Sequence, residues 1–73
     1  EEQTMIEELK RLLSEFIDTL PEKEKMVINL YYFEELTLKE IGMIIGVSES
    51  RVSQLHSKAL IKLKNMLKRV NVF

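Results

Sequence analysis

Cysteine is absent from this 73-residue sequence, and His56 is its only histidine. Without thiols the chain can form neither a disulfide framework nor a thiolate zinc site, and one imidazole cannot complete a zinc site by itself. We therefore expect no metal and no other cofactor. A chain this short buries only about 60% of the surface that its unfolded form exposes, so we predict a single small domain, residues 1–73, of modest stability.

Long hydrophobic runs are also missing. The longest unbroken apolar run is Ile41 to Val47, seven residues, against the roughly 20 that cross a membrane. The first residues are rich in Glu and lack an initiator Met, which is not the pattern of a signal peptide and is expected of a piece cut from a longer protein. With 45% hydrophobic and 32% charged residues, the composition is that of an ordinary globular domain, and we expect it in the cytoplasm, without a membrane partner.

The net charge of −1 conceals an uneven distribution of charge. Residues 1–36 contain ten acidic and four basic side chains, a net charge of −6, whereas residues 37–73 contain two acidic and seven basic side chains, a net charge of +5. Such polarity favours a basic surface for nucleic acid and an acidic or neutral surface for another partner. Two solvated helix faces would show the same imbalance, so charge alone leaves both interpretations open.

Apolar residues recur every three or four positions along the chain, and no stretch alternates with a period of two. This spacing is typical of amphipathic helices. It predicts four of them, near residues 5–18, 21–33, 38–45 and 49–69, and hence a small all-α domain. The apolar stripe expected for the second helix consists of Met26, Val27, Leu30, Tyr31 and Phe33.

Sequence signals for helix ends support these boundaries. The pattern Thr-x-x-Glu occurs at three predicted starts: Thr4/Glu7, Thr19/Glu22 and Thr37/Glu40. In such a capping box the Thr hydroxyl accepts from a first-turn N–H, while the Glu carboxylate accepts from the Thr N–H. Ser48 can cap the fourth helix without the Glu, and Gly46 can adopt the left-handed conformation that ends the third.

The last two predicted helices are separated only by Gly46, Val47 and Ser48. A three-residue turn with Gly, between a short helix and a longer one, is the helix-turn-helix pattern, predicted here for residues 38–69. Gly inside a helix costs roughly 1 kcal/mol relative to Ala, so we expect Gly42 to permit a close helix crossing. The wedge between the two helices is expected to hold Ile41, Ile45, Val47, Val52 and Leu55. A helical hairpin that never meets DNA is the alternative.

The helix predicted for residues 49–69 has an apolar side and a polar side when it is wound at about 100° per residue. Its first turns present the short polar groups Ser50, Ser53, Gln54 and Ser57, and its flanks carry the basic groups Arg51, Lys58, Lys62 and Arg69. Ser and Gln can bond base edges in a major groove, while Arg and Lys meet phosphates. Residues 50–73 contain six bases and no acid, which argues against a merely solvated face of mixed charge.

Three residues of this helix do not fit that division. The carboxylate of Glu49 would repel phosphate; it either accepts from cytosine N4 or favours the helix N-terminus through the macrodipole, and we favour the second role. His56 lies at the edge of the apolar stripe, where we expect a packing residue rather than a proton donor or ligand. Ile61 points to the polar side and has no core role that we can assign.

The second predicted helix is apolar nearly all round, because Ile28 and Tyr32 lie across from Met26 and Leu30. A small domain cannot bury every side of such a helix, so we predict an exposed patch for a protein partner at Ile28 and Tyr32. The alternative is that the first helix covers this surface.

The chain resembles region 4 of bacterial sigma factors of the sigma-70 family, from about Leu20 to Leu67. The resemblance rests on Leu20-Pro21-Glu22-Lys23-Glu24-Lys25, Leu30-Tyr31-Tyr32, the segments Glu34 to Gly42 and Val47 to Gln54, and Lys58-Ala59-Leu60 with Leu63. The run from Ser48 to Ser57 is most similar to the flagellar or motility subclass, the sigma-28 type.

This resemblance implies binding of promoter DNA as part of RNA polymerase holoenzyme. The helix after Ser48 would enter the major groove of the −35 element, and the residues that would face bases are Glu49, Ser50, Ser53 and Gln54, with Ser57 beyond them. The residues that would meet the DNA backbone are Thr37, Lys39, Arg51 and Lys58, with Lys62 farther along the same helix. The first half of the chain would dock the polymerase beta flap and, in the flagellar subclass, an anti-sigma factor.

The sequence departs from the housekeeping sigma factors within this helix. Those factors carry Arg at the positions of Glu49 and Ser53, and Glu at the position of Ser50. The resemblance therefore implies a −35 element that differs from the housekeeping one and is richer in A·T pairs.

Other functions remain open on the sequence. A response-regulator-type helix-turn-helix protein would bind palindromic half-sites as a dimer. A pure interaction module would not touch nucleic acid, and salt-dependent binding to any duplex separates it from both DNA-binding hypotheses. An enzyme with a small-molecule substrate is the least expected class, because no carboxylate pairs convincingly with His56 and no Gly-rich phosphate loop is present.

Overall fold

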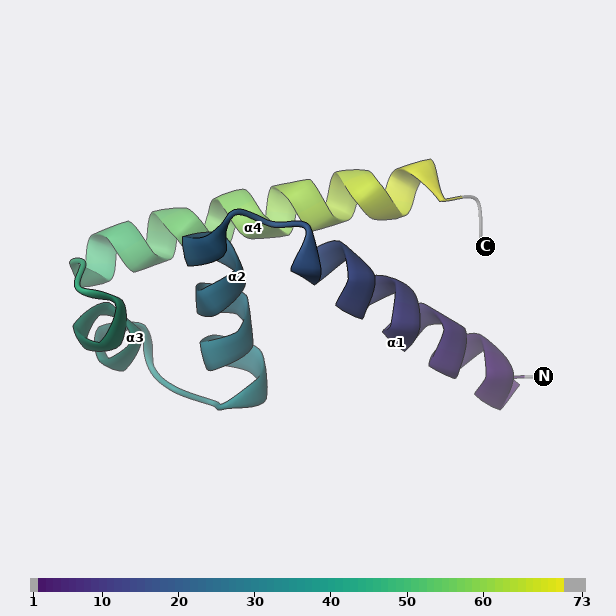
Figure 1. Cartoon of the computed structure of the whole chain (residues 1–73), viewed down its shortest axis with the longest axis horizontal. Helices are drawn as coiled ribbons and strands as arrows, with labels where there is room; N and C mark the ends of the chain where they lie inside the picture. Colours follow the sequence, from purple (N-terminus) through teal and green to yellow (C-terminus); the bar gives the residue numbers. More distant parts are fainter. Residues whose placement is uncertain (1, 71–73) are drawn as a thin grey trace.

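Four α-helices and one π-helical turn make up residues 2–70, the part of the chain that the computed structural model describes, with side chains from residue 4 on. They are α1 (Glu2–Asp18), α2 (Glu22–Ile28), the π turn η1 (Asn29–Phe33), α3 (Leu38–Ile45) and α4 (Glu49–Arg69) (Figure 1). Residues 2–70 contain no strand, so the prediction of an all-α fold is confirmed. No helix within this range is long and apolar enough to span a membrane.

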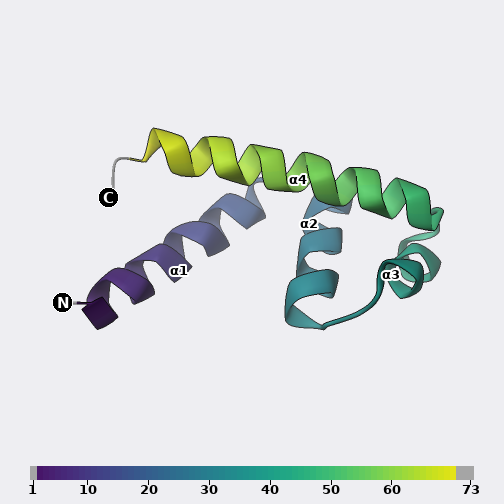
Figure 2. The same cartoon turned by 180° about the vertical axis from the view of Figure 1, so that it is seen from behind.

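The long helix α4 forms the common wall against which α1, α2 and α3 pack (Figures 1 and 2). α3 lies at the N-terminal end of α4, and α2 runs across α4 nearer its middle. α1 leaves the junction with α2 and diverges from the C-terminal half of α4. The molecule is therefore elongated, with extents of 42 × 21 × 15 Å.

The core consists of two apolar clusters side by side along α4. One joins α2, α3 and α4 through Val27, Ile41, Val52 and Leu55. The other joins α1, α2 and α4 through Ile17, Leu20, Ile28, Ala59 and Leu63. Ile41, Val52 and Leu55, expected in the wedge between α3 and α4, are buried in the first cluster, and Ile45 and Val47 are partly buried against it. Neighbouring residues of α2 supply both clusters, so α2 is the element that connects them.

The predicted helix caps around the turn are confirmed. The amide N–H of Glu40 donates to the Thr37 hydroxyl oxygen at 3.1 Å, and the Thr37 N–H donates to the Glu40 carboxylate at 2.8 Å. At the start of α4, the N–H of Arg51 donates to the Ser48 hydroxyl oxygen at 3.1 Å. Each bond satisfies a backbone N–H that has no partner within its helix, which is why these residues begin helices here.

The two capping boxes predicted upstream are wrong. α1 begins at Glu2, so Thr4 lies inside the helix rather than at its cap. Thr19 serves the end of α1 instead of the start of α2, because its hydroxyl donates to the carbonyl of Phe16 at 2.7 Å. The residue that precedes α2 is Pro21, with φ of −53° and no side-chain cap. The link between α1 and α2 is short, and Pro21 suits its last position because Pro has no backbone N–H that would need a hydrogen-bond partner.

The segment predicted as one helix, residues 21–33, is two elements. After Ile28 the backbone widens into η1, in which the N–H of Glu34 donates to the carbonyl of Asn29, five residues earlier, at 3.2 Å. The chain then turns through Glu35, whose φ of 57° is left-handed. The predicted end of the helical segment at residue 33 is confirmed, whereas the change from α- to π-helical backbone after Ile28 has no signal in the sequence.

This wide turn changes which residues of the second segment are buried. An i→i+5 turn rotates less per residue than an α-helix does, so a stripe laid out with a period of 3.6 loses its register after Ile28. Phe33, expected on the apolar stripe, is 67% exposed, whereas Ile28, expected on an exposed patch, is 2% exposed. Ile28 is covered by Ile17, at the C-terminal end of α1, and by Leu20, in the link between α1 and α2.

α1 carries a small network of ion pairs on its exposed surface. The guanidinium of Arg11 pairs with the carboxylates of Glu8 and Glu15, about one turn away on either side. The hydrogen bond from Arg11, together with its charge, holds the pKa of Glu8 below its usual value. The C-terminal end of this helix enters the core at Ile17, while Met5 near its other end is exposed. The apolar side of α1 is therefore buried only in part.

Candidate nucleic-acid interface

The turn between α3 and α4 is formed by Gly46, Val47 and Ser48, as predicted. The N–H groups of Gly46 and Val47 both donate to the carbonyl oxygen of Gly42, each at 2.9 Å, and Gly46 is left-handed with φ of 76°. The turn folds so closely over α3 that a Cβ at position 42 would lie 2.7 Å from the carbonyl oxygen of Val47. The close approach that requires Gly42 is thus made by the turn backbone rather than by the body of α4.

Beneath the turn, the predicted wedge holds α3 and α4 together. Ile41, Val52 and Leu55 are buried, and Ile45 and Val47 pack against them from the edge. A fully buried aliphatic side chain contributes about 1.5–3 kcal/mol relative to an exposed one. This packing turns the opposite face of the first turns of α4 toward solvent.

The outward face at the start of α4 is small and polar. Ser50, Ser53, Gln54 and Ser57 are all exposed, as the sequence predicted. The guanidinium of Arg51 donates to the side-chain oxygen of Gln54 at 3.2 Å, and the exposed Gln54 amide keeps its two N–H donors. A narrow helix end with short hydroxyl and amide groups can enter a major groove and bond base edges.

Basic side chains flank this polar face. Arg51 and Lys58 lie on one flank of α4 and are exposed, in a position to meet phosphates. Lys62 differs from them, because its ammonium group lies 2.9 Å from a carboxylate oxygen of Glu24 in α2. The Glu24 side chain is only 7% exposed. In the free domain Lys62 is therefore engaged by Glu24, and its contact with the DNA backbone stays a prediction.

The start of α3 supplies the remaining predicted backbone contacts. Lys39 and Thr37 are both exposed there, and the Thr37 hydroxyl oxygen accepts from the Glu40 N–H. The backbone N–H of Thr37, and then its side chain, hold the pKa of Glu40 below its usual value. Glu40 therefore stays ionised and offsets part of the positive charge at this helix end, which leaves Lys39 as the main attraction for a phosphate.

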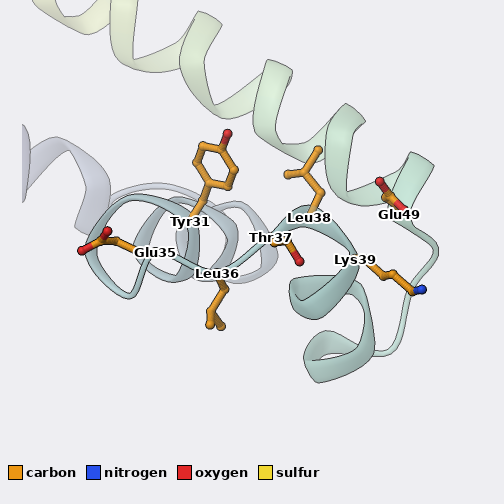
Figure 3. A pocket seen from close by; sticks show the side chains of 7 residues that line it. All are labelled: Tyr31, Glu35, Leu36, Thr37, Leu38, Lys39 and Glu49. Atoms are coloured by element: carbon orange, nitrogen blue, oxygen red, sulfur yellow. The ribbon is translucent and has the colours of Figure 1, made fainter.

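An open hollow of about 520 Å³ lies between η1 and the starts of α3 and α4 (Figure 3). Its walls are Tyr31, Glu35, Leu36, Thr37, Leu38, Lys39 and Glu49. Figure 3 shows Glu49 in the first turn of α4, across the turn from Lys39. A carboxylate at that place stabilises a helix N-terminus, which supports the dipole role that we favoured for Glu49.

The predicted partner patch is only half present. Ile28 is buried, as described above, and does not belong to any exposed surface. Tyr32 is 48% exposed, and its hydroxyl lies 2.7 Å from Nε2 of His56 in α4. The rings of Tyr32 and His56 stack with centroids 5.6 Å apart. His56 is thus a hydrogen-bonding partner of η1 as well as the packing residue that we predicted.

Sequence reasoning missed two long-range polar contacts of α4 near the candidate interface, which are Glu24–Lys62 and Tyr32–His56. A weak signal for the first was available. Glu24 lies three and four residues before Val27 and Ile28, so it shares their face of α2, and a carboxylate on a buried face requires a cation. No comparable signal announced the second, because it depends on η1.

Comparison with known proteins agrees with this geometry. The family described as Sigma-70, region 4, matches residues 16–65. The chain belongs to this family. It is 56% identical over 70 residues to the RNA polymerase sigma-D factor of Bacillus subtilis (strain 168), covering 96% of this chain and 28% of that protein. It is 53% identical over 66 residues to the RNA polymerase sigma factor FliA of Escherichia coli (strain K12), covering 90% of this chain and 28% of that protein.

A third relative confirms the subclass. The RNA polymerase sigma factor FliA of Pseudomonas aeruginosa is 54% identical over 61 residues, 84% of this chain and 25% of that protein. This region 4 chain therefore spans about a quarter of the length of the curated relatives it matches. Its similarity to sigma-D and FliA factors supports the sigma-28 type suggested by the run from Ser48 to Ser57.

Proposed function

We propose that this region 4 domain recognises the −35 element of promoters as part of a sigma factor of RNA polymerase that directs flagellar or motility genes. The observation that carries the proposal is the exposed polar start of α4, held outward by the turn over Gly42. Relatives that are named RNA polymerase sigma factors support it. The domain acts by binding and not by catalysis, and it works in the cytoplasm, where promoter DNA and polymerase meet.

Within this proposal, α4 lies in the major groove. The groups that face bases are Ser50, Ser53, Gln54 and Ser57, with Glu49 at the edge of the contact. The groups that meet the DNA backbone are Thr37, Lys39, Arg51 and Lys58. Short hydroxyl and amide groups read base edges, while flexible cations hold the phosphates and supply affinity without sequence information.

The acidic half of the chain is the side for protein partners. We propose that it docks the beta flap of the polymerase and, when the factor is silenced, an anti-sigma factor. The exposed aromatic residues Tyr32 and Phe33, beside Glu34 and Glu35, are the surface that supports this assignment. A partner with apolar and basic groups would match it.

This domain binds DNA weakly by itself and depends on tethering. With Lys62 paired internally, about four groups are left to meet phosphates, so the electrostatic share of affinity is small and sensitive to salt. Its charge of +5 on one half and −6 on the other largely cancels beyond a Debye length of about 8 Å. Attachment to a polymerase that grips DNA elsewhere raises the effective concentration, often by about 10²–10⁴. Nanomolar binding of the isolated 73-residue chain to a short −35 duplex would favour the independent dimeric regulator instead.

The direct test is the base preference of Gln54. In a holoenzyme whose sigma factor carries this chain as region 4, promoters are first selected from a pool with a randomised −35 element. Gln54→Ala should shift the preferred base at one position by about 1–3 kcal/mol, the value of a good bidentate contact. Asn65→Ala is the matched control, because it removes an exposed amide from the same face about three turns farther along α4. An unchanged preference with Gln54→Ala would show that this residue does not read bases.

A further inference from the structure

The crossing of α2 over α4 includes an apolar contact region at Ala59. Ile28 of α2 and Ala59 of α4 belong to the same buried cluster and are 2% and 0% exposed. Ala59 is small, so the two helices can approach closely there. Apolar contact of this kind is non-directional, and it would tolerate some rotation of α4 about its own axis.

Two polar side chains of α4 lie symmetrically about that crossing. His56 is three residues before Ala59 and Lys62 is three residues after it. At about 100° per residue, they project about 60° to either side of Ala59. Each is bonded to the helix that crosses beneath: His56 to Tyr32, at the η1 end, and Lys62 to Glu24, at the α2 start.

The Glu24–Lys62 contact is short and shielded. The ammonium nitrogen lies 2.9 Å from one carboxylate oxygen, and the other carboxylate oxygen is buried without a hydrogen-bond partner among the described residues. A buried carboxylate strongly disfavours any arrangement that moves its cation away. This contact therefore resists rotation of α4 in the direction that would carry Lys62 from α2.

The Tyr32–His56 contact restrains α4 from the other flank. The hydroxyl oxygen lies 2.7 Å from Nε2, the rings stack at 5.6 Å, and Tyr31 adds a second ring 5.1 Å from the imidazole. Hydrogen bonds weaken steeply when they lengthen or bend. Rotation of α4 away from η1 would break this bond, so the two contacts oppose each other.

The π turn is what makes the second contact possible. Along a continuous α-helix, Tyr32 would lie about 80° around the axis from Glu24, because eight residues exceed two turns by that angle. The wider turn from Asn29 to Phe33 rotates less per residue and returns Tyr32 toward the face that carries Glu24 and Ile28. Single π turns recur at functional sites in helices, and here one aligns Tyr32 with His56.

We propose that the two polar contacts, Glu24–Lys62 and Tyr32–His56, are positioning contacts that set the rotation of α4 on α2 and thereby aim its base-reading face. This inference rests on the proposed function. A side-chain tip lies about 5–6 Å from a helix axis, so a rotation of about 10° moves it by roughly 1 Å. That displacement exceeds the range of a hydrogen bond to a base edge. Contacts to phosphates carry no sequence information, so the same displacement would lower discrimination more than affinity.

The experiment therefore measures discrimination rather than affinity alone. Holoenzyme with this chain as region 4 is bound to its selected promoter and to the same promoter with single −35 base changes, and the ratio of the two affinities is the readout. Tyr32→Phe removes only the hydroxyl, and Tyr31→Phe is the matched control because its ring, but not its hydroxyl, contacts His56 within the described part of the chain. Thermal unfolding of the 73-residue chain checks that each variant folds.

We expect Tyr32→Phe to lower the discrimination ratio by about three- to tenfold, the range that one hydrogen bond supports, with the salt dependence unchanged. Tyr31→Phe should leave the ratio unchanged. A lowered melting temperature with an unaltered ratio would assign Tyr32 a purely structural role and overturn the proposal, as would equal effects of the two variants.

A second variant tests the other contact without leaving a buried charge. Glu24→Leu with Lys62→Met replaces the ion pair by apolar groups of similar size, a change that often preserves stability. The proposal requires a stable domain with reduced discrimination; a stable domain with full discrimination would overturn it. If the unmodified holoenzyme itself does not distinguish −35 sequences, the proposed function fails, and that outcome is separate from a failure of the variants alone.

Discussion

Local sequence signals predict the helix starts correctly at the helix-turn-helix end of the molecule and incorrectly in its N-terminal half. Around the turn, each local signal has its predicted effect: Thr37 and Ser48 cap their helices, and Gly46 takes the left-handed conformation. In the first half, Thr4 and Thr19 carry the same capping pattern and do not cap. The difference teaches that a local signal is reliable where its own backbone bonds complete the structure. It fails at Thr4, which lies inside α1, and at Thr19, whose hydroxyl donates back to the Phe16 carbonyl.

The largest expected change in stability comes from truncating a buried side chain of the core. Leu55→Ala should cost about 2–5 kcal/mol of unfolding free energy, because Leu55 is buried in the cluster that joins α2, α3 and α4. Phe33→Ala, a larger truncation on exposed η1, should change stability by less than about 0.5 kcal/mol. Urea unfolding followed by circular dichroism measures both. A loss below about 1 kcal/mol for Leu55→Ala would contradict the assignment of the core.

Substituting the two glycines near the turn compares the cost of a steric clash, at Gly42, with the cost of a left-handed backbone conformation, at Gly46. Gly42→Ala should destabilise the fold by about 1–3 kcal/mol, because the added Cβ meets the Val47 carbonyl oxygen at 2.7 Å and the backbone must shift. Gly46→Ala meets no atom within 4 Å and should cost only about 1 kcal/mol, for its left-handed φ. Chemical denaturation of both variants checks the order. A neutral or stabilising Gly42→Ala would show that helix propensity outweighs the close turn.

Two lysines on the same flank of α4 should have opposite roles. Lys62→Ala removes the cation of the buried Glu24 and should cost about 1–2 kcal/mol of stability, a value reduced because Lys62 is 44% exposed and water can replace part of its role. Lys58→Ala should leave stability unchanged but reduce the slope of log affinity against log salt by about one. Denaturation and salt-titrated DNA binding distinguish the two. Equal effects of both variants on the salt slope would add Lys62 to the DNA contacts.

The smallest expected effect is a gain. Glu35 has a left-handed φ of 57°, which costs a residue with a Cβ about 1–2 kcal/mol. Glu35→Gly should raise stability by about 0.5–1 kcal/mol after allowing for the greater freedom of Gly in the unfolded chain. Glu34→Gly is the matched control, since its φ of −97° suits any residue, and it should not stabilise. If the Glu35→Gly variant is less stable than the parent, the Glu35 side chain must contribute to stability in another way.

The sequence by itself determined the α3–turn–α4 end, including the bounds of both helices and the outward face of Ser50, Ser53, Gln54 and Ser57. The physical reason is proximity: the caps, the glycine turn and the wedge involve residues at most about 15 positions apart, so pattern and contact coincide. The tertiary structure decided what lies beneath α4. Glu24 meets Lys62 across 38 positions and Tyr32 meets His56 across 24, through a π turn that no residue type announces. Burial of Ile28 depends in turn on where α1 ends. Such contacts join separate helices, and the apolar periodicity within one helix does not predict which other helix will pack against it.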